Sequence, residues 1–494
     1  MVAHEAELAA LGDQAGALVR MGPVADHVAE TPQLIEAGSL NVGEHCLQRR
    51  QVRVDVAEDR QSHEPGEYRR DMTNPSGRRR VVRVGTAAVA MVLVAEAAVW
   101  LLRPRERPIE PAPVSEGQYF TQAQIDRGRT YGDGQLWLFL AVLGAQGAVL
   151  VTLALGRPAA VRRGLERLGA RPVLGAAAAG AGLSVALGVA ALPASIAAHQ
   201  RAVDYGISTQ SFGSWLADVG KSAAIGAALS AAGGALLIAL VRRFSRRWWL
   251  PGTVAVGAIA VVFVWLAPVV LAPLFNKFTP LPAGSKARAQ VLRLARHAGV
   301  DVGQVYRVNA SRRVRSLNAY VDGIGSTRRV VLYDNLLRRT NRPELRSIVA
   351  HELGHVKHDD VPRGLAFLIL VTPLGLLFTS ELGRALVWRT GVNPRGPAAL
   401  PAYMLGLAIA ALVLGVPGNQ LSRHVEASAD TFALRLTHDP KALIQVQRRL
   451  ALSSVANPDP PGIVTALIGT HPSTIDRIGA AVAYERETAT APSH

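Results

Sequence analysis

The chain has 494 residues, enough for two or more domains, and hydrophobic residues make up 49% of it, with a mean hydropathy of +0.19. It is strongly basic, with a formal net charge of +17. Nucleic-acid binding is one interpretation of this charge, but the arginine clusters flank apolar runs, which favours a membrane protein that binds no nucleic acid. The single cysteine, Cys46, excludes an intrachain disulfide and a cysteine-based zinc site. Any metal must therefore be bound by histidine and carboxylate.

The first 71 residues are polar and carry no apolar region of the kind that signal peptides contain. Two interpretations remain open for them. They form a disordered tail, or the native chain begins at Met72, which immediately precedes a basic stretch and the first apolar run.

Apolar segments follow at seven places along the chain. Their approximate limits are 81–102, 136–155, 172–198, 220–241, 249–275, 364–382 and 401–416. Most reach the ~20 residues that a bilayer core requires, whereas the last is short, as in a re-entrant or differently tilted segment. Glu96 lies inside the first segment, either in contact with another helix or near the membrane interface. The pattern predicts a polytopic protein of the cell membrane, with the lipid bilayer as a partner.

Arginine clusters precede the first segment and separate the second from the third and the fourth from the fifth. All three clusters fall on one side of an alternating topology. The tendency of basic loops to stay inside predicts that this side is cytoplasmic, with the long segment after residue 283 on the opposite side.

Residues 283–361 form the first soluble part. Ser285 to Ala298 has the pattern of an amphipathic helix. Short strands are predicted at Gln304–Val308, Leu317–Val321 and Arg329–Tyr333. An exposed edge strand here could pair with an extended peptide. The alternative is an ordinary sheet without an exposed edge.

The sequence His351-Glu352-Leu353-Gly354-His355 follows on a predicted helix. Asn341 can cap this helix, with Glu344 completing a capping box. Because residues four positions apart share a helix face, His351 and His355 can bind one Zn²⁺ ion, and Glu352 can reach a water molecule beside it.

After the seventh segment, Pro417-Gly418 predicts a break, and a second helix is expected over residues 419–430. Glu426 and Asp430 lie four positions apart on one face of it. Two histidines and one glutamate form a known ligand set for catalytic zinc, which makes Glu426 the candidate third ligand. Asp430 can orient a ligand imidazole from behind. His424 projects from another face and is not expected to bind the metal.

A further amphipathic helix is predicted at Lys441–Ser453, and His471 follows in Thr470-His471-Pro472. His471 can donate a hydrogen bond to an oxyanion that develops during peptide hydrolysis. The alternative is a histidine that merely occupies a turn before proline.

Taken together, these motifs resemble the CAAX prenyl protease 1 family of integral-membrane zinc metallopeptidases, over roughly residues 84 to 480. The residues that carry the resemblance are the junction Leu271–Leu281, Asn318-Ala319-Tyr320 with Gly323, His351-Glu352-x-x-His355, Glu426-x-x-x-Asp430, and His471-Pro472 with Arg477. Among the single motifs, only the zinc helix is specific for such a family. The order of all the motifs along the chain is highly specific.

The resemblance implies a mainly α-helical protein of seven transmembrane helices that enclose a chamber, with a zincin-type α+β peptidase domain on the cytosolic side. It implies that His351, His355 and Glu426 bind one zinc ion and that Glu352 is the catalytic base. Asp430 would support a ligand, and His471 and Arg477 would line the site. A substrate-binding strand would comprise Asn318, Ala319, Tyr320 and Gly323.

The sequence therefore predicts a zinc metalloendopeptidase that cleaves a peptide or protein substrate. We expect a membrane domain of five helices at 72–282 and a peptidase domain with two further membrane helices at 283–494. One alternative is a quality-control protease of the heat-shock type. The other is a catalytically silent membrane scaffold that contains zinc, against which the presence of Glu352 argues, because closed structural zinc sites need no base.

Overall fold

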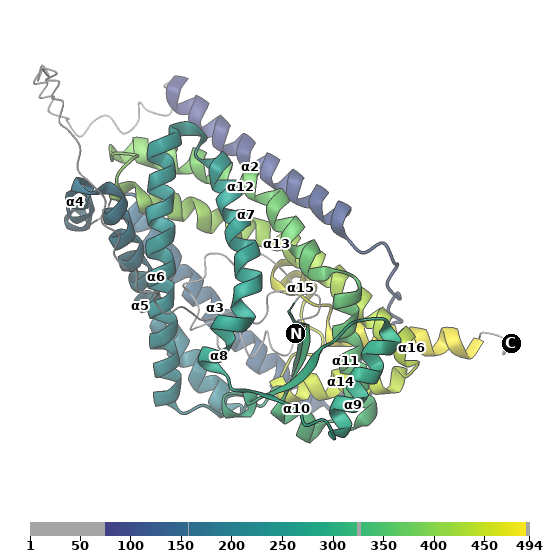
Figure 1. Ribbon diagram of the computed structural model, residues 1–494. Helices are drawn as coiled ribbons and strands as arrows, with labels where there is room; N and C mark the ends of the chain where they lie inside the picture. The colour runs from purple at the N-terminus through teal and green to yellow at the C-terminus, as the bar shows by residue number, and fades with distance from the viewer. Residues whose placement is uncertain (1–74, 157, 324–327, 491–494) are drawn as a thin grey trace, which may run out of the picture.

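The computed structural model describes residues 75–156, 158–323 and 328–490. Most of this part is helical (Figure 1). The long helices are α2 (Pro75–Leu102), α3 (Gln122–Ala154), α5 (Pro172–Asp204), α6 (Phe212–Phe244), α7 (Trp249–Leu266), α12 (Asp360–Thr390) and α13 (Leu400–Thr437). The predictions for residues 1–71 and for Met72 lie outside the described residues.

Shorter helices and a small sheet complete the fold. The helices are α4 (Ala159–Arg167), α8 (Ala272–Phe275), α9 (Lys286–Ala298), α10 (Asp334–Arg339), α11 (Arg342–Lys357), α14 (Pro440–Ser454), α15 (Gly462–Ile468) and α16 (Thr474–Thr490). The strands are β1 (Phe278–Pro280), β2 (Gln304–Val308), β3 (Ala319–Asp322) and β4 (Arg329–Tyr333).

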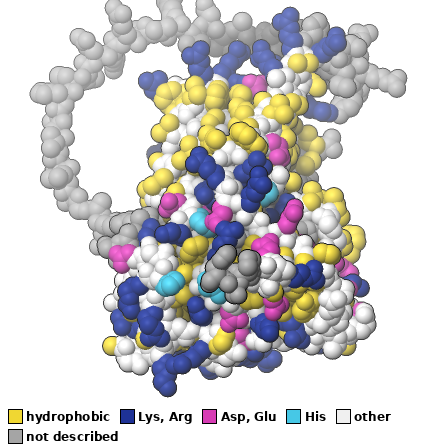
Figure 2. Space-filling view, turned by 90° about the vertical axis from the view of Figure 1, so that its right-hand side faces the viewer, with side chains coloured by type: hydrophobic (Ala, Val, Ile, Leu, Met, Phe, Trp, Pro, Cys, Tyr) yellow, Lys and Arg dark blue, Asp and Glu magenta, His cyan; other side chains and the backbone are white. Residues whose placement is uncertain are grey.

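Six described helices are long and apolar enough to cross a membrane, and there are seven spans if the bent pair formed by Trp249–Val264 and Ala267–Phe275 counts as one. The seven predicted segments coincide with these helices, and the predicted mainly helical membrane fold is confirmed. Large apolar side chains on the outer faces are exposed, as a bilayer requires, and Val254 is 73% exposed. Hydrophobic side chains cover much of the upper part of one face, with charged groups gathered below it (Figure 2).

The fifth span differs from the straight helix that its composition suggests. It bends by 47° where α7 gives way to a π-helical turn at Ala267–Leu271. Pro268 lies in this turn, and proline removes a helical hydrogen bond and clashes with the preceding turn, which accounts for the bend. The carbonyl oxygen of Pro268 also accepts a hydrogen bond from Arg329 Nη2 at 2.9 Å.

The helix break predicted at Pro417-Gly418 is wrong. Both residues lie inside α13, a single helix of 38 residues that contains the seventh span and continues to Thr437. Pro417 is buried and α13 packs against α12 and α2, and such packing stabilises a proline inside a membrane helix. Glu96 is exposed on α2, whereas its neighbours Met91 and Ala95 are buried against α12 and α13.

The part of the chain that follows the fifth span is built around a four-stranded sheet with the order β1-β2-β4-β3. The strands β2 and β4 pair in parallel, and β3 pairs with β4 antiparallel, with Ala319 opposite Leu332. The strands predicted at 304–308 and 329–333 are confirmed, but the intervening strand begins at Ala319, two residues later than predicted. The predicted helices at 285–298 and 441–453 correspond to α9 and α14.

The core of this part lies between the sheet and α9, α11 and α14. Val305, Val330 and Leu332 of the sheet contribute fully buried side chains, as does Leu353 of α11. Helix α11 also packs against α13 and β3. The helix that carries the paired histidines therefore lies between the seventh span and an edge of the sheet.

Candidate metal centre

The predicted capping box positions the start of α11. The Asn341 side chain accepts a hydrogen bond from the Glu344 amide at 2.9 Å, and a Glu344 carboxylate oxygen accepts one from the Asn341 amide at 2.9 Å. These bonds satisfy two backbone donors that a helix otherwise leaves unpaired. The helix then runs without interruption through both histidines to Lys357.

His351 and His355 project from the same face of α11, with their Nε2 atoms 3.2 Å apart. Glu426 reaches them from α13. Its Oε2 lies 3.2 Å from His351 Nε2, and its Oε1 lies 3.5 Å from His355 Nε2. The three side chains offer one ligand atom each, all within 4.8 Å of one another.

The chemistry of this donor set fits a divalent cation. Glu426 Oε2 is buried and receives no hydrogen bond of good geometry, although His351 Nε2 is close to it. A buried carboxylate oxygen left in this way is costly unless a cation or a proton lies beside it. Two imidazoles and one carboxylate are the protein ligands of several catalytic zinc sites, which keep a further position open.

Carboxylates hold both imidazole rings from behind. Asp430 Oδ1 lies 2.9 Å from His351 Nδ1, and Asp360 Oδ2 lies 3.0 Å from His355 Nδ1. An Nδ1–H bonded to a carboxylate leaves Nε2 as the metal-binding nitrogen. Asp430 was predicted to act in this way, whereas Asp360 was not.

Asp360 was missed because a turn of the chain, rather than helical spacing, places it. Helix α11 ends at Lys357, and Asp359 adopts a left-handed conformation with φ 54°. This turn brings Asp360, the first residue of α12, back to His355. Arg363 Nη1 in turn donates to Asp360 Oδ1 at 2.8 Å. The only sequence signal was an aspartate shortly after the second histidine.

Arg477 supports Asp430 from the first turn of α16. Its Nε and Nη2 donate to the two carboxylate oxygens at 2.6 and 2.7 Å, and both side chains are buried. Gln447 of α14 lies behind Arg477, and with its amide oxygen facing the guanidinium it accepts hydrogen bonds from Nε and Nη2 at 3.2 Å. Gln447 was not among the predicted residues.

His471 also reaches the site. Its Nε2 lies 3.3 Å from Glu426 Oε1, and its Nδ1 lies 2.8 Å from Thr470 Oγ1. The histidine is buried beside the metal ligands, so the structure places it at the centre rather than in a peripheral turn. His424 is not among the three residues that could bind a metal.

Burial and the neighbouring carboxylates shift the pKa values of these histidines in opposite directions. Burial lowers the pKa of His351, but Asp430 and Glu426 outweigh it and raise the pKa to about 10. Burial also lowers the pKa of His355, but Glu426 and Asp360 outweigh it, so this pKa is raised. Burial lowers the pKa of His471 to about 4. A site that attracts protons so strongly also attracts a metal cation in their place.

Glu352 follows His351 on α11 and is half-buried. Burial raises the pKa of its carboxyl group, although the two histidines oppose the shift. A carboxylate whose pKa is raised toward neutrality is a more effective proton acceptor and donor at physiological pH. The structure thus places a general base candidate next to the metal ligands.

The four residues predicted to bind substrate lie at and around β3. Ala319 and Tyr320 are in the strand, Asn318 precedes it, and Gly323 follows it with φ 83°. Within the described residues, no strand pairs with the outer edge of β3. Since β3 also packs on α11, this edge of the sheet lies next to the helix of the paired histidines.

Comparisons with known proteins place the chain in a family. A model of peptidase family M48 matches residues 284–485, and a model of the CAAX prenyl protease N-terminal region, described as five membrane helices, matches residues 110–277. The chain is 31% identical to an uncharacterized metalloprotease, YhfN, of Bacillus subtilis over 63% of this chain and 73% of that protein.

A CAAX prenyl protease 1 homolog of Oryza sativa is 31% identical over 45% of this chain, and the match spans only about half (53%) of that protein's own length. The crystal structure of Ste24p from S. mikatae shares the fold, with a TM-score of 0.66 and 19% identity over 81% of this chain and 98% of that chain. The family resemblance noted from the motifs is confirmed. The chain belongs to peptidase family M48 and is a multi-pass membrane metalloprotease.

Proposed function

We propose that the protein is a zinc-dependent endopeptidase in which His351, His355 and Glu426 hold one zinc ion. The observation that carries this proposal is the approach of Glu426, from a membrane helix, to the two Nε2 atoms whose rings are fixed from behind by Asp430 and Asp360. Zinc bound there would supply Lewis-acid chemistry, acidifying water and polarising the scissile carbonyl group.

Glu352 acts as the general base. Its carboxylate accepts a proton from the attacking water and delivers that proton to the nitrogen of the leaving amine. Its raised pKa suits both transfers, because the group must bind the proton and release it within one catalytic cycle.

His471 and Arg477 support the reaction in two different ways. The lowered pKa of His471 keeps its ring neutral, and its Nε2 can donate a hydrogen bond to the oxyanion that develops on the substrate carbonyl. Arg477 acts through Asp430, whose carboxylate it holds against His351.

The substrate binds as an extended strand along the outer edge of β3. Backbone groups of Ala319 and Tyr320 would pair with the peptide, between Asn318 on one side and Gly323 on the other. Main-chain pairing gives affinity without strong sequence preference, which suits a protease that acts on peptide or protein chains.

The chain divides functionally into a membrane domain at 72–282 and a peptidase domain at 283–494 that contains the last two spans. The membrane helices would enclose a chamber onto which the metal site opens. A silent scaffold is disfavoured, because three protein ligands leave a position open and a base stands beside them. A quality-control role differs only in substrate, and cleavage of misfolded membrane proteins would identify it.

The test compares the full chain with two variants. Glu352→Gln should retain zinc but lose proteolysis by about 10²- to 10⁴-fold, because the proton acceptor is removed and the ligands remain. Glu426→Gln should lose zinc. Metal content measured by mass spectrometry and cleavage of unfolded casein give the two readouts, and Glu487→Gln, exposed on α16, is the control. A zinc-loaded Glu352→Gln protein with full turnover would falsify the assignment of the base.

A further inference from the structure

A short helix, α15, precedes His471 and lies beside α13 (Figure 1). It has only seven residues, and a helix of that length is not stable on its own in water. The last four carbonyl groups of a helix also lack the hydrogen bonds that the helix itself would supply. In α15 these carbonyl groups belong to residues 465–468, so groups from outside the helix must stabilise this end.

Two side chains of α13 hold the end of α15. Arg423 Nη1 donates to the Thr465 carbonyl at 2.8 Å and to the Gly469 carbonyl at 2.5 Å. Asn419 Nδ2 donates to the Leu467 carbonyl at 3.0 Å. A guanidinium group is favourable at this position, because the carbonyl end of a helix carries a partial negative charge. Arg423 therefore acts as a charged cap of α15.

The turn that carries His471 lies between this cap and the start of α16. Within the turn, Thr470 Oγ1 lies 2.8 Å from His471 Nδ1. At the far side, the Ser473 amide donates to Asp476 Oδ2 at 3.2 Å, and the Asp476 amide donates to Ser473 Oγ at 3.0 Å. The turn is thus anchored at both ends, by Arg423 before it and by the first turn of α16 after it.

One helix carries both a proposed metal ligand and the anchor of the His471 turn. Arg423 and Glu426 are three positions apart on α13, so they lie on the same side of it, about 4.5 Å apart along its axis. His471 Nε2 lies 3.3 Å from Glu426 Oε1. Because α13 is continuous here, a fixed Arg423 also fixes where His471 stands relative to the metal ligands.

We propose that Arg423 is a positioning residue for the reaction, which holds the end of α15 so that His471 can donate its hydrogen bond to the oxyanion. The inference rests on the proposed peptidase function and on the role of His471 in it. Arg423 acts through the backbone, since it bonds to carbonyl groups of α15 and of the residue that follows it. A shift of about 1 Å in a catalytic group can cost about 10²-fold in rate, so the effect is measurable.

The experiment measures kcat and KM of the zinc-loaded full chain in detergent with a quenched fluorescent peptide derived from casein. The variants are Arg423→Gln, Arg423→Lys, His471→Ala and the double variant Arg423→Gln/His471→Ala. Arg435→Gln is the matched control, because Arg435 lies on the same helix but pairs with Glu106 on an exposed face. Zinc content and the unfolding temperature are measured for each protein, so that kcat refers to zinc-loaded molecules.

We expect Arg423→Gln to keep zinc and to lower kcat by about 10- to 100-fold with little change in KM, because the oxyanion exists only beyond the ground state. Arg423→Lys should recover part of the lost kcat, since its ammonium group can donate to the same carbonyl oxygens. Arg435→Gln should match the wild type. The double variant should be no slower than His471→Ala alone, because Arg423 acts only through His471.

A second measurement separates positioning from a contribution to folding alone. A phosphinic peptide that mimics the tetrahedral intermediate should bind about tenfold or more weakly to Arg423→Gln than to the wild type. The uncleaved substrate should bind equally well to Glu352→Gln with and without Arg423→Gln. If Arg423→Gln does not fold, Arg423→Lys replaces it in the same comparison with His471→Ala.

The outcomes distinguish this inference from the peptidase function. An unchanged kcat per zinc-loaded molecule in Arg423→Gln, or rate losses that multiply in the double variant, overturns the positioning role and leaves the peptidase intact. A His471→Ala protein with full turnover overturns both the role of His471 and this inference. A zinc-loaded wild type that cleaves no peptide overturns the peptidase function and this inference with it.

Discussion

At the scale of single residues, Asp360 shows how strongly the metal centre depends on groups behind the ligands. It is 1% exposed, it contacts His355 Nδ1, and Arg363 neutralises it. We predict that Asp360→Asn weakens zinc affinity by about 10- to 100-fold, because the amide holds the imidazole less firmly and makes it a weaker ligand.

The neighbouring residue provides the control for this prediction. Asp359 is exposed and has a positive φ, which asparagine tolerates, so Asp359→Asn should leave zinc affinity unchanged. Titration of both variants with a competing chelator measures the difference. Equal affinities would mean that Asp360 serves the fold and not the metal.

The residues of the site differ in how far their roles could be predicted. His351 and His355 were predictable because helical spacing fixes their common face whatever the tertiary fold. Glu426 came from the chemistry of known zinc sites together with a family resemblance. Asp360 and Gln447 could not be found, since a left-handed turn at Asp359 places the first and the packing of α14 on α16 places the second.

At the scale of elements, the close approach of α11 and α13 brings Glu426 to the histidines. Gly354 allows this approach, because a Cβ atom there would lie 3.3 Å from Ala429 Cα and 3.2 Å from Phe432 Cδ1. We predict that Gly354→Val separates the two helices, destabilises the protein by about 1–3 kcal/mol and releases zinc.

A glycine of α13, the other helix of this contact, tests whether the effect is local. A Cβ atom at Gly415 would meet nothing within 4 Å, so Gly415→Val should keep both zinc and thermal stability. Zinc content and the unfolding temperature in detergent are compared for the two variants. Full zinc occupancy in Gly354→Val would show that the site does not depend on this contact.

The elements were predictable where their pattern is local. Long apolar segments gave the spans, and β2 and β4 were placed at their observed limits. The break expected at Pro417 failed because that rule describes an isolated helix, whereas packing against neighbouring helices supports the chain there. Because α13 is uninterrupted, it joins Glu426 of the metal site rigidly to the seventh span.

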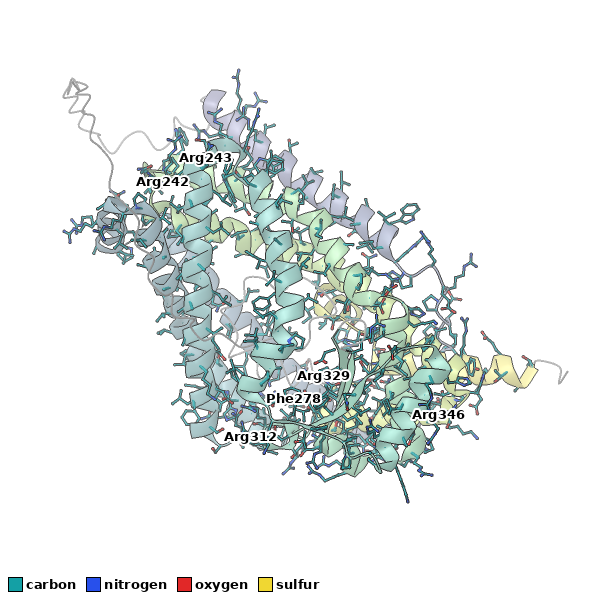
Figure 3. All side chains as sticks on the ribbon, viewed as in Figure 1. Arg242, Arg243, Phe278, Arg312, Arg329 and Arg346 are labelled. Carbon is teal, nitrogen blue, oxygen red and sulfur yellow. The ribbon has the colours of Figure 1, made fainter. Side chains whose placement is uncertain are left out.

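At the scale of the whole molecule, the arginine clusters gather at the end opposite the metal centre. Arg242 and Arg243 lie at one end of the molecule, and Arg312 and Arg346 lie at the other, near the peptidase part (Figure 3). Arg242 and Arg395 bond across the first of these ends, where Arg242 Nη1 donates to the Arg395 carbonyl at 3.5 Å. The loop between α5 and α6, at the peptidase end, carries no charge.

Short basic loops stay in the cytoplasm during insertion, so we predict that this arginine-rich end is cytoplasmic and that the peptidase part faces the other side. The test uses single cysteines in a Cys46→Ser background, which is otherwise free of thiols. Arg163→Cys, exposed on α4, should resist a membrane-impermeant maleimide in intact cells, whereas Arg338→Cys on α10 should react. Both should react after solubilisation in detergent. The reverse pattern would place the peptidase in the cytosol, as the family resemblance implies, and would mean that contacts of the long soluble segment outweigh the arginine loops in setting the topology.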